Sequence, residues 1–135
     1  MNKLINISEA TSIAIHSLAI ISRKEEMINA QYLSDVTGFS KNHISKILQI
    51  LVKQGYIAST RGPKGGFKTL MDTGDLTLLE IYELFDGHIN SDFCKNHKEI
   101  CPFLDCSISE IIDDLTKTFI EKFGNKKIGD LAFKF

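Results

Sequence analysis

The segment Thr37-Gly38-Phe39-Ser40 limits the folds open to this chain more than any other. On both of its sides, apolar residues recur at the spacing of short amphipathic helices, and Asn29 is placed to cap the first helix. Gly38 can adopt the left-handed backbone that ends a helix, and Ser40 can accept hydrogen bonds from the first amides of the next. The sequence therefore predicts two short helices joined by a tight turn, which form a helix-turn-helix.

The second of these helices has an apolar stripe and a polar face. The stripe falls at i, i+3, i+4 and i+7 and consists of Ile44, Ile47, Leu48 and Leu51. In a helix-turn-helix, the first residues of the second helix face the major groove of DNA, where polar side chains bind phosphates and base edges. The predicted DNA-contacting residues here are Ser40, Lys41, Asn42, His43, Ser45 and Lys46.

A glycine-rich turn at residues 61–66 lies between two runs, residues 56–60 and 67–70, that predict antiparallel strands. Such a turn forms the tip of a β-ribbon, and cations at the tip suit a narrow minor groove. Paired helices and cationic turns each occur in proteins that bind no DNA, but both in this order predict a winged helix-turn-helix bound to double-stranded DNA. The tip residues predicted to contact DNA are Arg61, Pro63 and Lys64.

The formal net charge of −1 conceals a basic segment followed by an acidic one. Between residues 23 and 68, lysines and arginines outnumber acids, whereas after residue 70 the acids outnumber the lysines. A basic surface attracts a polyanion such as DNA. The basic segment coincides with the helix-turn-helix and the wing, which strengthens the prediction of DNA binding.

All the cysteines lie in one short segment after the wing, with the spacing C-x6-C-x4-C. Thiolates bind zinc or iron–sulfur clusters, and three of them are one too few for an all-cysteine tetrahedral site. The sequence shows no secretory signal and no apolar run of about 18 residues, so we expect a cytoplasmic protein without membrane contact, where metal binding is favoured over disulfides. The predicted ligands are Cys94, Cys101 and Cys106, with His97 as the local candidate for the fourth and His88 and His16 as weaker ones.

Two further helices complete the predicted fold. Thr77 and Glu80 are spaced as a capping box that starts a helix ending at Gly87, which we expect to pack under the wing. Ser107 and Glu110 form a second such box, at the start of a long helix to about residue 123. The apolar face of this long helix comprises Ile108, Ile111, Ile112, Leu115, Phe119, Ile120 and Phe123.

That apolar face needs a partner, because the first 90 residues or so can already close a small core. We therefore predict a homodimer, which also suits a two-fold DNA operator. The predicted fold class is mainly α with a small β-ribbon. Residues 1–90 form the winged helix-turn-helix domain, residues 91–106 the cysteine-containing cluster loop, and residues 107–135 the dimerisation helix and a short docking tail.

The order of these parts resembles a family of bacterial winged-helix transcription regulators that includes the iron–sulfur regulators IscR and NsrR. The resemblance covers nearly the whole chain and is most specific at residues 40–46, 55–67, 94–106 and 128–131. It implies a dimeric regulator, a repressor, whose operator affinity is controlled by a [2Fe–2S] or [4Fe–4S] cluster on the three cysteines. In some members a carboxylate from the first helix of the partner subunit completes the cluster, and Glu9 falls at the matching place.

The same residues also allow other functions for this chain. Three thiolates with the imidazole of His97 can hold a structural zinc ion, and free thiols can respond directly to oxidants without a cluster. A cysteine beside His97 could serve as a catalytic nucleophile, but no oxyanion-hole or cofactor motif accompanies it, so we predict no enzyme and no small-molecule substrate. A module that binds only other proteins is the remaining alternative.

Overall fold

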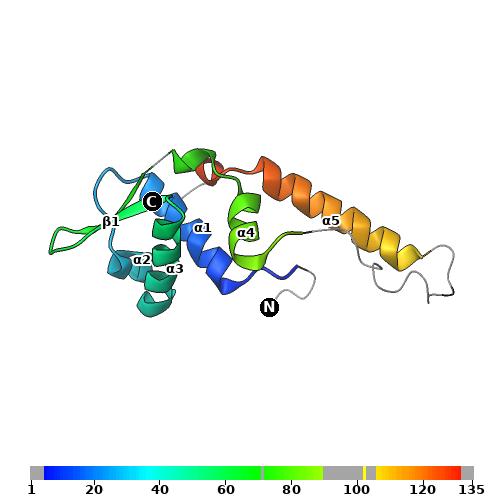
Figure 1. The fold of residues 1–135 in the computed structure, drawn as a ribbon, viewed down its shortest axis with the longest axis horizontal. Helices are drawn as coiled ribbons and strands as arrows, with labels where there is room; N and C mark the ends of the chain where they lie inside the picture. Colours follow the sequence, from blue (N-terminus) through cyan, green and yellow to red (C-terminus); the bar gives the residue numbers. More distant parts are fainter. Residues whose placement is uncertain (1–4, 71, 90–101, 103–105, 132–135) are drawn as a thin grey trace.

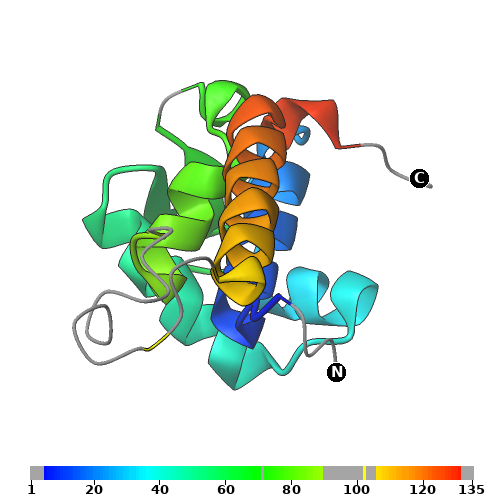
Figure 2. The same ribbon diagram turned by 90° about the vertical axis from the view of Figure 1, so that its right-hand side faces the viewer.

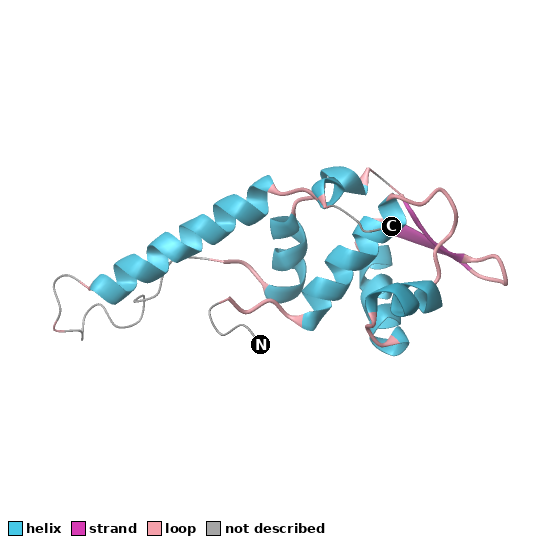
Figure 3. Cartoon of the chain, turned by 180° about the vertical axis from the view of Figure 1, so that it is seen from behind, coloured by secondary structure: helices cyan, strands magenta, loops and turns pink. Residues whose placement is uncertain are grey.

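The structure is a computed structural model that describes residues 5–70, 72–89, 102 and 106–131 (Figure 1). Its described part is mainly helical with one two-stranded antiparallel sheet, and this confirms the predicted fold class (Figure 3). The elements are α1 (Glu9–Ser22), α2 (Ala30–Thr37), α3 (Lys41–Lys53), β1 (Ile57–Thr60), β2 (Gly66–Thr69), η1 (Thr73–Asp75), α4 (Leu78–Asp86), α5 (Ser107–Asn125) and η2 (Ile128–Asp130).

Helix α1 forms the centre of the core. Apolar residues occur on nearly all of its sides, and α2, α3, α4, β2, η1 and η2 all pack against it. A helix that is apolar all round is stable only when it is covered all round. The buried positions of α1 are Thr11, Ile13, Ala14, Ser17, Leu18, Ala19, Ile20 and Ile21.

The helix-turn-helix forms as predicted. The Asn29 side chain accepts a hydrogen bond from the Tyr32 amide at 2.8 Å, and Ser40 Oγ accepts one from the His43 amide at 3.1 Å. Gly38 between them has a φ of 82°, the left-handed conformation that glycine adopts without strain. The Ser34 hydroxyl also donates to the Phe39 carbonyl at 2.7 Å, so the turn is held from both sides.

Strands β1 and β2 form the wing, in a register that pairs Ile57 with Thr69 and Thr60 with Gly66. A Cβ at Gly65 would lie 2.1 Å from the Thr60 carbonyl oxygen, so the tight tip requires glycine there. The sequence did not reveal a third extended segment: Ile28 exchanges two backbone hydrogen bonds with Phe67, at 3.0 and 2.7 Å. This pairing fastens the wing to the chain just before α2.

The end of α5 returns to the core through a short backbone junction. The Leu78 amide donates to the Lys126 carbonyl at 2.9 Å, and the Ile128 amide donates to the Leu76 carbonyl at 2.7 Å. Ile128 is fully buried. Arg23, which directly follows α1, donates to the carbonyls of Gly129 and Leu131. The predicted docking tail is therefore seen as far as residue 131.

Three predicted details of the last two helices differ in the structure. Helix α4 has its Thr77–Glu80 capping box but packs against α1 and α5, not under the wing. Helix α5 begins one residue after Cys106, whose carbonyl accepts from the Glu110 amide at 3.1 Å. Ser107 is thus already inside the helix and cannot form the second capping box. The helix ends at Asn125, two residues beyond the predicted end at about residue 123.

Replacing Ile128 by Ala should lower the free energy of unfolding by about 2–5 kcal/mol, because it removes a fully buried side chain and leaves a cavity. Urea titration at one fixed protein concentration measures this change. Leu70→Ala is the control, since Leu70 is 62% exposed and its loss should change stability little. An Ile128→Ala variant as stable as the Leu70→Ala control would contradict the packing described for η2.

Candidate nucleic-acid interface and sensor residues

The first turn of α3 presents the residues that the sequence assigned to DNA. Ser40, Lys41, Asn42 and Lys46 are exposed, whereas Ile44 on the opposite face is fully buried. Ser45 is only half-exposed, and its hydroxyl donates to the Lys41 carbonyl at 2.9 Å. Its oxygen therefore remains available mainly as an acceptor.

The wing tip lies at the same end of the molecule as α2 and α3, and the N-terminal end of α5 lies at the other (Figures 1 and 3). Arg61, Pro63 and Lys64 are all exposed at this tip. The structure therefore places both groups of predicted DNA-contacting residues on one half of the molecule. A recognition helix flanked by a cationic ribbon can contact a groove and the neighbouring backbone together.

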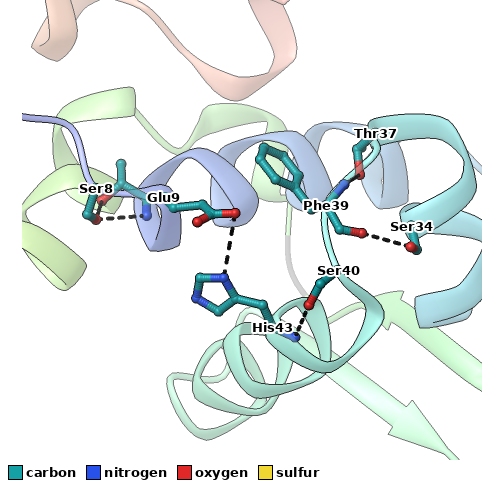
Figure 4. Close-up of polar contacts among 8 residues, drawn as sticks. Ser8, Glu9, Ser34, Thr37, Phe39, Ser40 and His43 are labelled. Carbon is teal, nitrogen blue, oxygen red and sulfur yellow. Dashed lines mark hydrogen bonds and ion pairs between the residues drawn. The ribbon is translucent and has the colours of Figure 1, made fainter. Parts of the chain in front are cut away.

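Glu9 lies beside the recognition helix of its own chain (Figure 4). Its Oε1 is 3.8 Å from Nδ1 of His43, and the two side chains are 61% and 36% exposed. Sequence reasoning missed this contact, because the two residues belong to different helices that no local spacing connects. The predicted cluster ligand and a predicted DNA-contacting residue are thus neighbours.

The start of α1 is fastened to the end of α4 through Asp86. Asp86 Oδ2 accepts from the Ser8 amide at 3.2 Å and from the Thr11 hydroxyl at 2.5 Å. The Tyr82 hydroxyl donates to the Asn6 carbonyl at 3.2 Å. Burial, with a smaller contribution from the Asp86 carboxylate, raises the pKa of Tyr82 above its usual value, which keeps this phenol a donor. The chain enters the predicted cysteine loop directly after this junction.

Of the three predicted cysteine ligands, the structure describes Cys106, a half-buried free thiol at the N-cap of α5. Cys94, Cys101 and His97 lie outside the described residues. His88 pairs with Glu83 at 3.1 Å, and Nδ1 of His16 lies 2.6 Å from the Ser12 carbonyl oxygen. Within the described ranges, no three His, Cys, Asp or Glu side chains converge as a metal site.

The two halves of α5 have different surroundings. Towards its C-terminal end, Phe119 and Phe123 pack on Tyr82 of α4, with ring centroids 5.1 and 6.2 Å away. Figure 2 shows α5 running beside α4. Towards its N-terminal end, apolar side chains are exposed: Ile108 at 61%, Ile111 at 56% and Leu115 at 44%. No residue of α5 is buried within this single chain.

A groove of about 400 Å³ adjoins this exposed stripe. It lies between α5, α4 and the segment that precedes α1, and its walls are mostly apolar. Its lining residues include Ile5, Tyr82, Ile89, Ile112, Leu115 and Phe119. In the described part of the chain, no helix is both long enough and apolar enough to cross a membrane.

Comparison with known proteins gives a consistent result. The chain is 24% identical to the HTH-type transcriptional regulator NsrR of Bacillus subtilis over 112 residues, which is 82% of this chain and 77% of that protein. Its fold matches CymR, described as the global cysteine regulator of B. subtilis, with a TM-score of 0.77 and 18% identity, over 95% of this chain and 96% of that one. It also matches T. potens IscR, with a TM-score of 0.71 and 15% identity, over 93% and 85% of the two chains.

The family model for Rrf2, described as an iron-dependent transcriptional regulator, matches residues 7–134. This match spans the winged helix-turn-helix, the cysteine segment and α5, and it confirms the resemblance found in the sequence. The relatives are transcriptional regulators and not enzymes, as predicted. The chain belongs to the Rrf2 family of transcriptional regulators.

Proposed function

We propose that this regulator binds a two-fold DNA operator as a homodimer and that the cysteine segment controls its operator affinity through an iron–sulfur cluster. The observation that carries the DNA-binding part is the exposed polar first turn of α3 beside the cationic wing. Asn42 and His43 would contact base edges, while Lys41, Lys46, Arg61 and Lys64 would contact phosphates.

The proposed dimer is supported by the uncovered apolar face of α5. A helix with no buried residue removes little apolar surface from water on its own. It therefore needs a partner surface to be stable. The exposed Ile108, Ile111 and Leu115 continue the apolar groove beside α4. A second copy offers the same apolar face, and a two-fold contact between the copies covers both.

The donor set suits an iron–sulfur cluster. Soft thiolates are its usual ligands, and the cluster would be held by Cys94, Cys101 and Cys106, with Glu9 of the partner subunit or the local His97 as the fourth ligand. Cys106 is a free thiol and Glu9 carries an exposed carboxylate, so neither is committed to the core. When bound, the cluster supplies reversible redox chemistry. The 2.5 Å Asp86–Thr11 hydrogen bond joins the segment before the cysteines to α1, and α1 packs on α3.

Two alternatives use the same cysteines. A structural zinc ion on Cys94, His97, Cys101 and Cys106 would stabilise the segment without sensing. A direct thiol switch needs accessible free thiols, and Cys106 is one. In both cases DNA binding by the winged helix would remain.

Lys64→Ala should weaken binding to every duplex and lower the slope of log affinity against log salt by about one, because it removes one phosphate contact. Asn42→Ala should instead reduce discrimination at one base pair by about 1–3 kcal/mol. Titration of operator and unrelated DNA at several salt concentrations separates these effects. Lys117→Ala on α5 is the control and should change neither. Identical responses of the Lys64 and Asn42 variants would contradict the roles assigned to them.

Ile111→Glu should convert the dimer to a monomer at micromolar concentration, because it places a charge in an apolar interface. Sedimentation equilibrium measures the molecular mass in solution. Lys117→Glu, a charge reversal at an exposed position of the same helix, should leave the dimer intact. A wild-type monomer, or a dimeric Ile111→Glu variant, would rule out the α5 interface.

Anaerobic reconstitution with iron and sulfide should give a coloured protein that contains both elements, whereas a Cys106→Ser variant should lose most of the colour because it lacks one thiolate. The absorption spectrum, with iron, sulfide and zinc analysis, measures this outcome. Protein that stays colourless and iron-free would exclude the cluster. Zinc in stoichiometric amount would favour the structural site, and reversible oxidation of metal-free thiols by peroxide would favour the direct switch.

A further inference from the structure

The contact between the side chains of Glu9 and His43 joins an element of the core to the proposed DNA-reading surface (Figure 4). The Nδ1 atom of His43 faces the Glu9 carboxylate at 3.8 Å, which is an ion-pair distance and slightly beyond a hydrogen bond. Both side chains are partly exposed, so the pair adds little to stability. The contact can instead restrict which way the imidazole ring faces.

Both ends of this pair rise from fixed backbone. Ser8 caps α1 one residue before Glu9, and the Ser8 amide is itself held by Asp86. On the other side, the His43 amide donates to Ser40 Oγ, and the next residue, Ile44, is fully buried. Only side-chain rotation remains free to shorten the 3.8 Å separation of the carboxylate and Nδ1 to a hydrogen bond.

The direction in which the ring faces decides what His43 can offer to DNA. In a neutral imidazole one nitrogen donates and the other accepts, and the hydrogen bond made by one nitrogen sets the role of the other. A carboxylate only accepts, so it selects the form with the proton on Nδ1. The Nε2 atom is then an acceptor, which matches the N–H groups of adenine N6 or cytosine N4 and not the acceptors of guanine.

We propose that Glu9 is a positioning residue that fixes the ring orientation and tautomer of His43, and thereby the base that His43 selects. This inference rests on the proposed DNA-binding function and refines it. It gives Glu9 a role in the metal-free protein that is separate from the proposed role as a cluster ligand.

The first test is the nitrogen-15 NMR spectrum of the His43 imidazole at about pH 8, with the neutral state of the ring verified from the same chemical shifts. Metal-free protein without DNA is used. The wild type should carry the proton mainly on Nδ1, and Glu9→Ala should shift it toward Nε2. Glu9→Gln should retain the wild-type form, because its amide oxygen still accepts, and the exposed Glu121→Ala should have no effect. The same tautomer in wild type and Glu9→Ala would overturn the inference.

The second test selects DNA from a library of randomised duplexes, again with metal-free protein at about pH 8. Glu9→Ala and His43→Ala should lose discrimination at the same operator position, by roughly fivefold or more, and the double variant should lose no more than His43→Ala alone. Glu9→Gln should keep most of the preference.

These results separate the inference from the proposed function. If the wild type selects an operator and Glu9→Ala selects it with the same base preference, the positioning role is wrong and DNA binding stands. If the wild type enriches no duplex either metal-free or after reconstitution with iron and sulfide, the proposed function fails, and the role of Glu9 in base selection fails with it.

Discussion

The burial of α1 on nearly all sides is the constraint on which the rest of the structure depends. Every other described element except α5 and β1 packs on this helix, directly and extensively, so its position fixes the recognition helix, the wing and the C-terminal junction together. Asp86 and Arg23 strengthen this arrangement at the two ends of α1, where each binds groups of a distant segment. Both ends of α1 are therefore bound to segments that lie far away in the sequence.

Local patterns in the sequence predicted most of the fold. Asn29, Gly38, Ser40 and the Thr77–Glu80 pair all occupy the capping positions expected of them, because caps depend on residues only a few positions apart. The wing also formed as expected, since the glycines at its tip allow the tight turn between the strands, in which a side chain at Gly65 would clash. The N-cap of α5 was predicted at Ser107, one residue later than the observed N-cap, Cys106. Two adjacent small or polar residues both suit that position, so the sequence does not distinguish them.

Contacts between distant segments were not predictable in the same way. Ile28 pairs with Phe67, Asp86 binds Ser8 and Thr11, and Glu9 approaches His43, and none of these pairs leaves a periodic signal in the sequence. Water can satisfy the hydrogen bonds of an exposed charged residue such as Glu9, so the residue type alone does not indicate a protein partner. The exposure of the first turn of α3 was predictable because a helix-turn-helix fixes which turn faces outward, whereas the contact of His43 with Glu9 required three dimensions.

The way α5 is attached has a mechanical consequence. Its C-terminal end is held by the Leu78 and Ile128 backbone junction, while its N-terminal end extends away from the core (Figure 1). A helix of 19 residues is about 28 Å long at 1.5 Å per residue. As a matter of geometry, a tilt of about 10° at its held end would displace the far end, where Cys106 lies, by roughly 5 Å. A small rotation near the core would therefore produce a larger displacement at Cys106.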